Sequence, residues 1–315
     1  MTGNRKALLA LTIAGVLWGL TVPLTKVALL WLDPLTLSVA RFALAAPALA
    51  LLARRGLREA LTPAVLGWGV VLYAGAFALQ NIGVGLTSVS HAALVFGTVP
   101  VMVAALGLVG GSTGSRVTWI GFGLALVGVA LLSRPAGESS LLGDGLVLAS
   151  AALSALFIAG QPSVLRGRDP IAVTAVQMAA GTLVLLPLAA FFEGPPPAPS
   201  AIEPMLAFGL LASAGSLLPF SLYAFAQSRV PAEVTGAFVN LEPLVGAAAG
   251  ALAFGDPFGP LQMTGVAAIL LGLALSTELD LSSRSRNQPK HGLARGAVRV
   301  PVAGPSEYQG PGTGT

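Results

Sequence analysis

The feature that most constrains this chain is a series of apolar runs, each close to twenty residues long. A helix rises about 1.5 Å per residue, so roughly twenty apolar residues are needed to cross about 30 Å of hydrocarbon. The runs cover residues 7–31, 34–53, 64–85, 89–110, 117–133, 143–164, 171–192, 204–228, 231–254 and 258–277. The sequence therefore predicts an all-α integral membrane protein with ten transmembrane helices.

Composition agrees with a membrane protein and excludes several other classes. Only 10% of the residues are charged, whereas a soluble domain has about 25%. The chain has no cysteine, which excludes disulfides, thiol chemistry and cysteine-ligated metals. The sequence has no HExxH, Walker A or GxSxG motif. We therefore expect no cofactor, no metal and no enzymatic activity.

The positive charges predict the orientation of the chain. With the N-terminus in the cytoplasm, the inner loops and the C-terminal tail hold fourteen Lys and Arg residues, and the outer loops hold only Arg134. Cytoplasmic loops of membrane proteins are enriched in these residues. We expect a multi-pass protein of the cell membrane (inner or plasma membrane) with both termini cytoplasmic. The excess of Lys and Arg over Asp and Glu then reflects the orientation of the chain in the membrane, and nucleic acid is not an expected partner.

The two halves of the chain repeat each other. Matching positions, at offsets that grow from 136 to 144, include Asp33 and Asp169, Phe77 and Phe220, Pro100 and Pro243, and Gly121 and Gly265. Each half has five runs, so the second half enters the membrane from the opposite face. This predicts two inverted five-helix repeats, residues 7–133 and 143–277, a construction that secondary transporters use. The polar residues 278–315 are predicted to be a disordered cytoplasmic tail.

Short motifs occur in the same order in the runs. They are Gly15-Val16-Leu17-Trp18-Gly19-Leu20-Thr21 followed by Lys26, then Ala40-Arg41-Phe42, Pro100, Leu241-Glu242-Pro243 and Gly255-Asp256. In this pattern the chain resembles the EamA-like branch of the drug/metabolite transporter superfamily over residues 7–277. The resemblance implies a ten-helix fold around a central cavity lined mainly by spans one to four and six to nine. It also implies that spans five and ten pack at the periphery, where a homodimer contact is one use for them.

Charged residues inside the bilayer are costly, so each is a candidate for substrate binding or coupling. Glu242 lies eleven residues into its run, about 16 Å deep, and Pro243 leaves a backbone carbonyl free beside it. Glu242 would accept a proton or bind a substrate amine, with a hydrogen-bonded structural role as the alternative. Arg41, about 10 Å deep, would bind a substrate carboxylate or an internal acid, or else snorkel. For Lys26 snorkelling is favoured, and for His91 a structural imidazole is favoured.

Neutral polar and aromatic residues form a second candidate group. Under the repeat, Arg41 aligns with Gln177 and Gln80 with Tyr223, and paired polar positions suit a lumen better than a lipid face. The group comprises Trp18, Thr21, Phe77, Gln80, Asn81, Thr98, Gln161, Gln177, Tyr223 and Asn240. For Trp18 and Phe77 the alternative is plain packing. Helix packing or bending is the predicted role of Gly15, Gly19, Gly246, Gly250, Pro100 and Pro243.

These features predict a secondary transporter, an exporter or permease for a small metabolite or drug, that works by alternating access. Proton coupling and exchange are both open as its driving force. The expected partners are the lipid bilayer and a small-molecule substrate. The alternative is a membrane-embedded enzyme or sensor. Against an acid dyad, Glu233 and Glu242 lie nine residues apart, which places them on opposite sides of one helix.

Overall fold

The computed structural model describes residues 2–53, 56–87, 92, 95–109, 116–132, 140–199, 201–254 and 259–287. Side chains are described in these ranges except at residues 2–3, 22–23, 26, 84, 132, 247, 250–254 and 277–287. Within the described ranges the chain forms helices and no strand. The prediction of an all-α fold is therefore confirmed.

The helices follow the apolar runs, with the short α3 as an addition. In the first half they are α1 (Thr2–Ala28), α2 (Pro34–Leu52), α3 (Leu57–Ala60), α4 (Pro63–Gly69), α5 (Phe77–Leu86), α7 (Val99–Val109) and α8 (Arg116–Leu132). In the second half they are α9 (Leu141–Leu165), α10 (Pro170–Phe192), α11 (Ile202–Ala212), α12 (Leu218–Gln227), α13 (Ala232–Ala237), α14 (Leu241–Phe254) and α15 (Pro260–Asn287). The last helix passes the expected end at residue 277, because neither glycine nor proline occurs between Gly272 and Pro289 to stop it.

Several helical stretches are long and apolar enough to cross a membrane. Five reach at least eighteen residues: Pro34–Leu52, Pro63–Gly83, Leu141–Leu165, Pro170–Phe192 and Ile202–Gln227. Shorter apolar helices cover Val99–Val109, Arg116–Leu131 and Pro260–Ser276. The count of ten spans remains a prediction, and the predicted disorder of the tail beyond Asn287 falls outside the described residues.

The second helix of each half begins at an Asp-Pro pair, but the two starts are capped differently. Asp169 Oδ1 accepts hydrogen bonds from the backbone N–H groups of Ile171 (2.8 Å) and Ala172 (3.1 Å) at the start of α10. At the start of α2 the acceptor is Glu193, which follows α10 and receives the N–H groups of Leu35 (2.8 Å) and Thr36 (2.7 Å). Free N–H groups at a helix start favour such a carboxylate. Glu193 therefore joins the second helices of the two halves.

The third apolar run of each half contains a π-helical segment. These are η1 (Val70–Ala76), between α4 and α5, and η2 (Ser213–Leu217), between α11 and α12. The two segments begin 143 residues apart, which is the offset that relates Phe77 to Phe220. A π-helical turn widens the helix and disturbs its regular hydrogen bonding, and such turns are frequent at functional sites.

Each half also interrupts its next helix just before a proline. Because proline has no N–H, Pro100 and Pro243 leave the carbonyl four residues earlier without its α-helical partner. In the second half the chain tightens into a 3-10 turn, η3 (Phe238–Asn240), between α13 and α14. In the first half a turn at residues 97–98 precedes α7. The irregular turn therefore lies on the N-terminal side of each proline.

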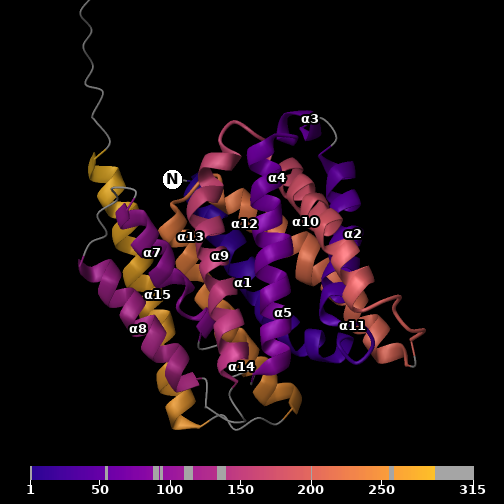
Figure 1. Ribbon diagram of the computed structural model, residues 1–315. Helices are drawn as coiled ribbons and strands as arrows, with labels where there is room; N and C mark the ends of the chain where they lie inside the picture. The colour runs from indigo at the N-terminus through magenta and orange to yellow at the C-terminus, as the bar shows by residue number, and fades with distance from the viewer. Residues whose placement is uncertain are drawn as a thin grey trace, which may run out of the picture.

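The last helices of the two halves, α8 and α15, pack against each other through glycine. Figure 1 shows α8 and α15 side by side at one edge of the molecule. A Cβ atom on Gly121 would lie 2.7 Å from the carbonyl oxygen of Gly272, and one on Gly128 would lie 2.6 Å from that of Gly265. Only glycine allows helix axes to approach this closely. Elsewhere α1 packs against α14, and α2 against α10.

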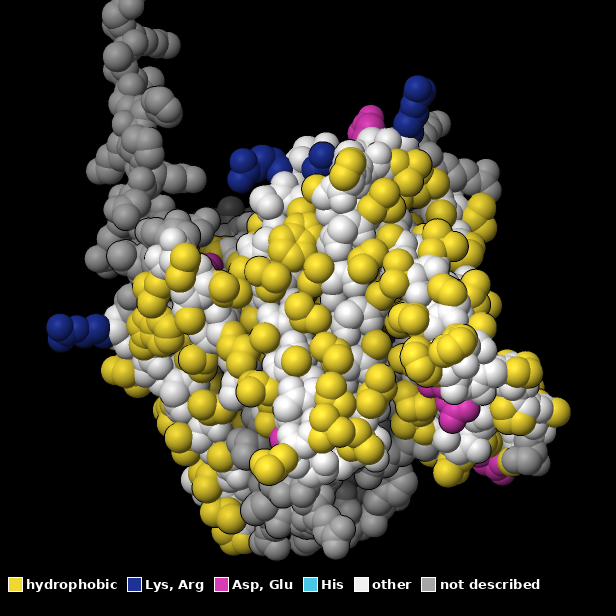
Figure 2. Space-filling view, in the orientation of Figure 1, with side chains coloured by type: hydrophobic (Ala, Val, Ile, Leu, Met, Phe, Trp, Pro, Cys, Tyr) yellow, Lys and Arg dark blue, Asp and Glu magenta, His cyan; other side chains and the backbone are white. Residues whose placement is uncertain are grey.

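The outer surface carries large apolar side chains. Figure 2 shows them across one face, with charged side chains mainly toward its ends. Leu183 on α10 is 70% exposed and Ile120 on α8 is 60% exposed. In water, exposure of so many apolar side chains would be unfavourable and would favour association. The surface suits contact with lipid tails.

Candidate functional site

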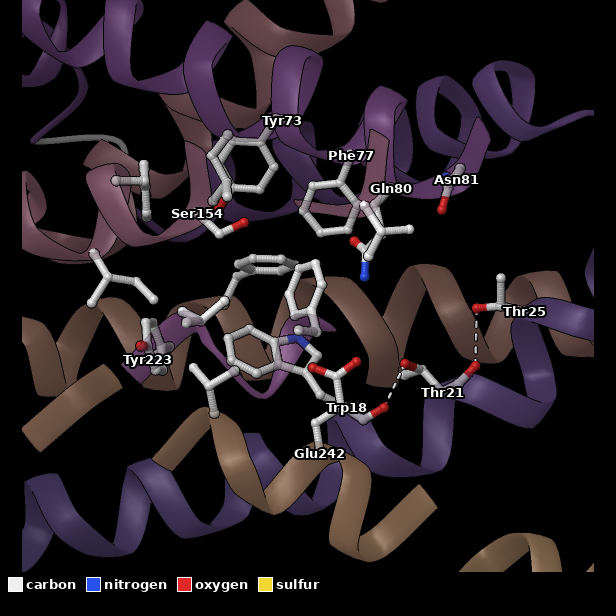
Figure 3. A pocket seen from close by; sticks show the side chains of 18 of the residues that line it. Trp18, Thr21, Thr25, Tyr73, Phe77, Gln80, Asn81, Ser154, Tyr223 and Glu242 are labelled. Carbon is white, nitrogen blue, oxygen red and sulfur yellow. Dashed lines mark hydrogen bonds between the residues drawn. The ribbon is translucent and has the colours of Figure 1, made fainter. Parts of the chain in front are cut away.

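One cavity of about 220 Å³ lies in the middle of the helices and is lined by both halves of the chain. Its walls come from α1, α2, η1, α5 and α7 in the first half, and from α9, α10, α12, η3 and α14 in the second. Figure 3 shows side chains from these helices converging on it. The irregular turns before Pro100 and Pro243 reach its wall through Gly97 and Asn240.

Aromatic rings form much of the cavity wall. The ring of Phe220 lies 5.0 Å from Trp18, 5.1 Å from Tyr73 and 5.8 Å from Phe77, measured between centroids. Trp18 also lies 5.0 Å from Tyr223. Edge-to-face arrangements at such distances are favourable for aromatic pairs. Phe77 and Phe220, which the repeat relates, meet in this cluster.

Arg41 of α2 is the cation of the cavity wall and is only 5% exposed. Its Nε donates to the Ser216 hydroxyl (2.8 Å), and its Nη2 donates to the Gly215 carbonyl (3.1 Å). Both acceptors belong to η2. Its guanidinium carbon also lies 5.4 Å from the Phe42 ring centroid and 5.7 Å from that of Phe77. The π-helical segment of one half therefore holds the buried cation of the other.

Glu242 is the acid of the cavity wall and lies in the first turn of α14. Figure 3 shows its half-buried carboxylate directed into the cavity beside Trp18. In the part of the chain that the structure describes, this carboxylate has no hydrogen-bond donor and no ion-pair partner within 4.0 Å. Glu242 is nonetheless near enough to Arg41 to interact with it electrostatically.

Several polar residues predicted as site residues use their hydrogen bonds within the protein. Gln161 and Gln177 form a reciprocal pair, with Nε2-to-Oε1 distances of 2.9 and 2.8 Å. Asn81 Nδ2 donates to the Ser38 hydroxyl at 2.7 Å. Thr98 donates to a carbonyl of its own turn at 2.6 Å. These bonds leave the four side chains with fewer free hydrogen-bonding groups for a ligand.

Two other amides in the cavity wall are under-satisfied. Gln227 Nε2 and Asn240 Oδ1 are buried without a hydrogen-bond partner, and each residue is 2% exposed. An unpaired buried polar group costs about 1–3 kcal/mol. Gln262 Nε2 on α15 is unpaired in the same way but does not line the cavity.

Most of the residues predicted from sequence meet in this one cavity. Its wall contains Trp18, Thr21, Arg41, Phe77, Gln80, Asn81, Gln161, Tyr223, Asn240, Glu242 and Pro243. Gln177, Thr98 and Pro100 are outside the wall. For Lys26 only the backbone is described, and His91 is outside the described residues.

The glycines predicted to pack lie on two neighbouring helices. Gly15 and Gly19 of α1 face α14, where a Cβ on Gly19 would lie 2.8 Å from the Glu242 carbonyl oxygen. Gly246 and Gly250 lie in α14 itself.

Sequence reasoning missed Tyr73, Ser154, Phe157, Phe220 and Gln227 as wall residues. The repeat offers a signal for three of them. Adding 136 to Trp18 and Thr21 gives Ser154 and Phe157, and adding 143 to Phe77 gives Phe220. Adding the repeat offset to Trp18, Thr21 and Phe77, which were already candidate site residues, would have identified these three positions. Within the described ranges, no group of three His, Asp or Glu side chains is placed to hold a metal ion.

Comparison with known proteins gives consistent matches along the chain. The model of the EamA-like transporter family matches residues 5–134 and 141–277. An uncharacterized transporter of Archaeoglobus fulgidus is 26% identical over 251 residues, which are 76% of this chain and 86% of that protein. An uncharacterized protein of Pseudomonas aeruginosa is 31% identical over 227 residues, 69% of this chain and 75% of the other.

A solved structure also shares the fold. A protein crystal structure superposes with a TM-score of 0.76 at 19% identity, covering 89% of this chain and 99% of that one. At this identity the likeness concerns the fold alone.

Proposed function

Because the chain belongs to the EamA-like transporter family, a family of multi-pass membrane transporters, we propose that it is a secondary transporter that carries a small molecule through the central cavity by alternating access. The cavity carries the proposal. It is built from both halves of the chain, and its wall holds one charged residue from each half, the buried Arg41 on α2 and the half-buried Glu242 on α14. Ionisable groups at this depth in a membrane protein are costly and are usually kept for a substrate or ion pathway.

The symmetry of the packing supports ten spans arranged as two inverted repeats, residues 7–133 and 143–277. The contact of Gly121 with Gly272 becomes the contact of Gly265 with Gly128 when each residue is replaced by its repeat partner. The contact of α1 with α14 has its counterpart in the contact of α9 with α7. Two similar halves can exchange their conformations, which gives inward-open and outward-open states of similar energy.

The paired irregular turns support the same mechanism. Broken helices at the centre of a transporter supply backbone groups to a site and places where the chain can bend. Here η1 and η2 occupy matching positions, as do the turns before Pro100 and Pro243, and all four border the cavity or hold a residue of its wall. We assign bending during transport to these four segments.

Direction, driving force and assembly complete the proposal. The protein acts as an exporter or permease for small metabolites or drugs, with both termini in the cytoplasm. Glu242 couples transport to protons, or the protein exchanges one substrate molecule for another. The peripheral pair α8 and α15 has exposed apolar side chains such as Ile120, which suits lipid or a homodimer contact.

Counterflow in liposomes that contain no nucleotide tests the proposed function. Vesicles are loaded with one unlabelled compound of a panel of small polar and amphipathic molecules, and uptake of a labelled trace of the same compound is followed. Secondary transport predicts transient accumulation for the substrate. Flux that appears only when ATP is supplied would contradict it.

Two tryptophan substitutions test whether the cavity is the route. Ser154, which is 8% exposed, lies in the cavity wall, whereas Leu183 of α10 is on the outer surface. Ser154→Trp should fill the cavity and abolish counterflow, and Leu183→Trp should keep it. Equal counterflow in both variants at equal amounts of folded protein would contradict a route through this cavity.

A further inference from the structure

The cavity wall is more exposed at one end than at the other. Thr25, Leu29 and Gln80, which lie near the C-terminal ends of α1 and α5, are half-buried wall residues. Gln161 near the end of α9 and Thr174 near the start of α10 are also wall residues, but each is only 1% exposed. We call the first the open end and the second the closed end.

Packing places these two ends far apart. At the closed end, a Cβ atom on Gly160 of α9 would collide with the ring of Trp68 on α4, so this end lies level with Trp68. Gln80 follows Trp68 by twelve residues in the same helical run, a distance of more than about 15 Å along the axis. Figure 3 likewise shows Thr25 at one end of the cavity and Tyr223 at the other.

A reciprocal pair of hydrogen bonds lies at the closed end. Gln161 and Gln177 exchange two bonds of 2.9 and 2.8 Å, which join α9 to α10. Gln161 belongs to the cavity wall, whereas Gln177 is 0% exposed and lies outside the wall. We call these residues the second-half pair. If α9 and α10 separate at this end, both hydrogen bonds must break.

The repeat assigns this pair a counterpart in the first half. Subtracting 136 from 161 and 177 gives Thr25 and Arg41, which are both wall residues. We call Thr25 and Arg41 the first-half pair. Arginine is longer than glutamine and threonine is shorter, so the two pairs have a similar combined reach. The first-half pair is therefore able to join α1 to α2 as the second-half pair joins α9 to α10.

The members of the first-half pair have other partners in this structure. Thr25 Oγ1 donates to the carbonyl four residues earlier in α1 (3.0 Å), and Arg41 donates to Ser216 and Gly215 of η2. Among the hydrogen bonds of the described residues, none joins Thr25 to Arg41. Ser216 has a further bond to the carbonyl five residues earlier (3.0 Å). Its hydroxyl therefore stays satisfied if Arg41 changes partner.

We propose that the two pairs form alternately as the two ends of the cavity open and close. Here the second-half pair holds the closed end. When the two halves exchange their conformations, Gln161 and Gln177 separate, and Arg41 leaves η2 and donates to the Thr25 hydroxyl. The guanidinium group, with five N–H donors, can make this change without losing all its partners. The inference rests on the proposed function and assigns the residues that control alternating access.

Two reporter thiols measure which end of the cavity is open. The chain has no cysteine, so Leu29→Cys at the open end and Thr174→Cys at the closed end each supply a single thiol. The measurement is the rate at which a small water-soluble methanethiosulfonate reagent modifies each thiol in the purified full chain. With no other substitution, Leu29→Cys should react faster than Thr174→Cys.

Two further substitutions should shift these rates in opposite directions. Gln177→Leu breaks the second-half pair and leaves the cavity wall unchanged. It should raise the rate at Thr174→Cys by at least about threefold, the size expected for one neutral hydrogen bond, and lower the rate at Leu29→Cys. Thr25→Val should lower the rate at Thr174→Cys by a similar factor. Thr25 lies at the far end of the cavity, so local loosening around Thr174 does not explain such an effect.

Matched controls separate this effect from a general loss of packing. The Thr12 hydroxyl also donates to the carbonyl four residues earlier in α1 at 3.0 Å, but Thr12 lies outside the cavity wall. Gln262 of α15 is a buried glutamine outside the wall. Thr12→Val and Gln262→Leu should therefore leave both rates unchanged. Gln177→Asn, whose amide is too short to reach Gln161, replaces Gln177→Leu if the leucine variant folds poorly.

The outcomes distinguish this inference from the proposed function. An unchanged rate at Thr174→Cys in Gln177→Leu or in Thr25→Val, or shifts of the same sign in both, would overturn the inference. Either result together with wild-type counterflow would leave secondary transport standing. Opposite shifts in a chain that shows no counterflow would reject secondary transport and keep the two pairs as a switch between two conformations.

Discussion

Gly19→Ala introduces one methyl group at the contact between α1 and α14. Its Cβ would lie 2.5 Å from the Val245 Cβ and 2.8 Å from the Glu242 carbonyl oxygen. Ordinary contact begins near 3.4 Å, so the two helices must separate by about 0.9 Å. Overpacking of this kind costs about 1–3 kcal/mol, and the better helix propensity of alanine offsets about 1 kcal/mol of it. We expect a net loss of stability of about 0–2 kcal/mol.

The matched control is Gly123→Ala in α8, where the added Cβ meets no atom within 4 Å. Only the higher helix propensity of alanine applies there, so the free energy of unfolding should stay equal or rise by up to about 1 kcal/mol. Thermal unfolding of both variants in the same detergent measures the difference, and counterflow measures its consequence. Gly19→Ala should melt below Gly123→Ala and lose flux, because Trp18 and Glu242 move apart with their helices. Equal melting temperatures and equal flux would refute the reasoning.

Three further predictions concern the polar groups. Arg41→Ala should reduce flux more than Lys26→Ala, because Arg41 is buried in the cavity wall; equal flux at matched expression would remove Arg41 from the site. Gln227→Met should raise the melting temperature and lower flux, because it removes an unpaired buried amide nitrogen from the cavity wall. The control Gln262→Met should leave flux unchanged, since Gln262 does not line the cavity. A lower melting temperature for Gln227→Met would contradict this prediction. Glu242→Gln should abolish the response of flux to an imposed pH gradient, since glutamine cannot exchange a proton; a wild type that ignores the gradient would exclude proton coupling.

The apolar runs predicted the helices well because a lipid environment restricts a spanning segment strongly. A helix in lipid must satisfy its own backbone and present apolar side chains over about twenty residues. Buried charge was a similarly strong signal, since Arg41 and Glu242 could be singled out by cost alone and both line the cavity. These inferences needed no knowledge of neighbouring helices.

Features that depend on neighbouring helices were out of reach. The pairing of Gln161 with Gln177 requires the exact approach of α9 to α10. The two hydrogen bonds from Arg41 to η2 depend on a π-helical turn that the hydropathy of the sequence does not reveal. Gln227 looked like an ordinary polar residue at the end of a run, and only the fold brings it to the cavity.

The central claim is that one cavity is reached alternately from the two sides of the membrane. The chain has no cysteine, so Gln80→Cys in the cavity wall (Figure 3) supplies a single reactive thiol. The measurement is labelling of this thiol by a membrane-impermeant reagent, added either outside or inside vesicles of uniform orientation, with Leu183→Cys on the outer surface as the control. The account predicts labelling of Gln80→Cys from each side in turn. Labelling from only one side under all conditions, with counterflow intact, would contradict it.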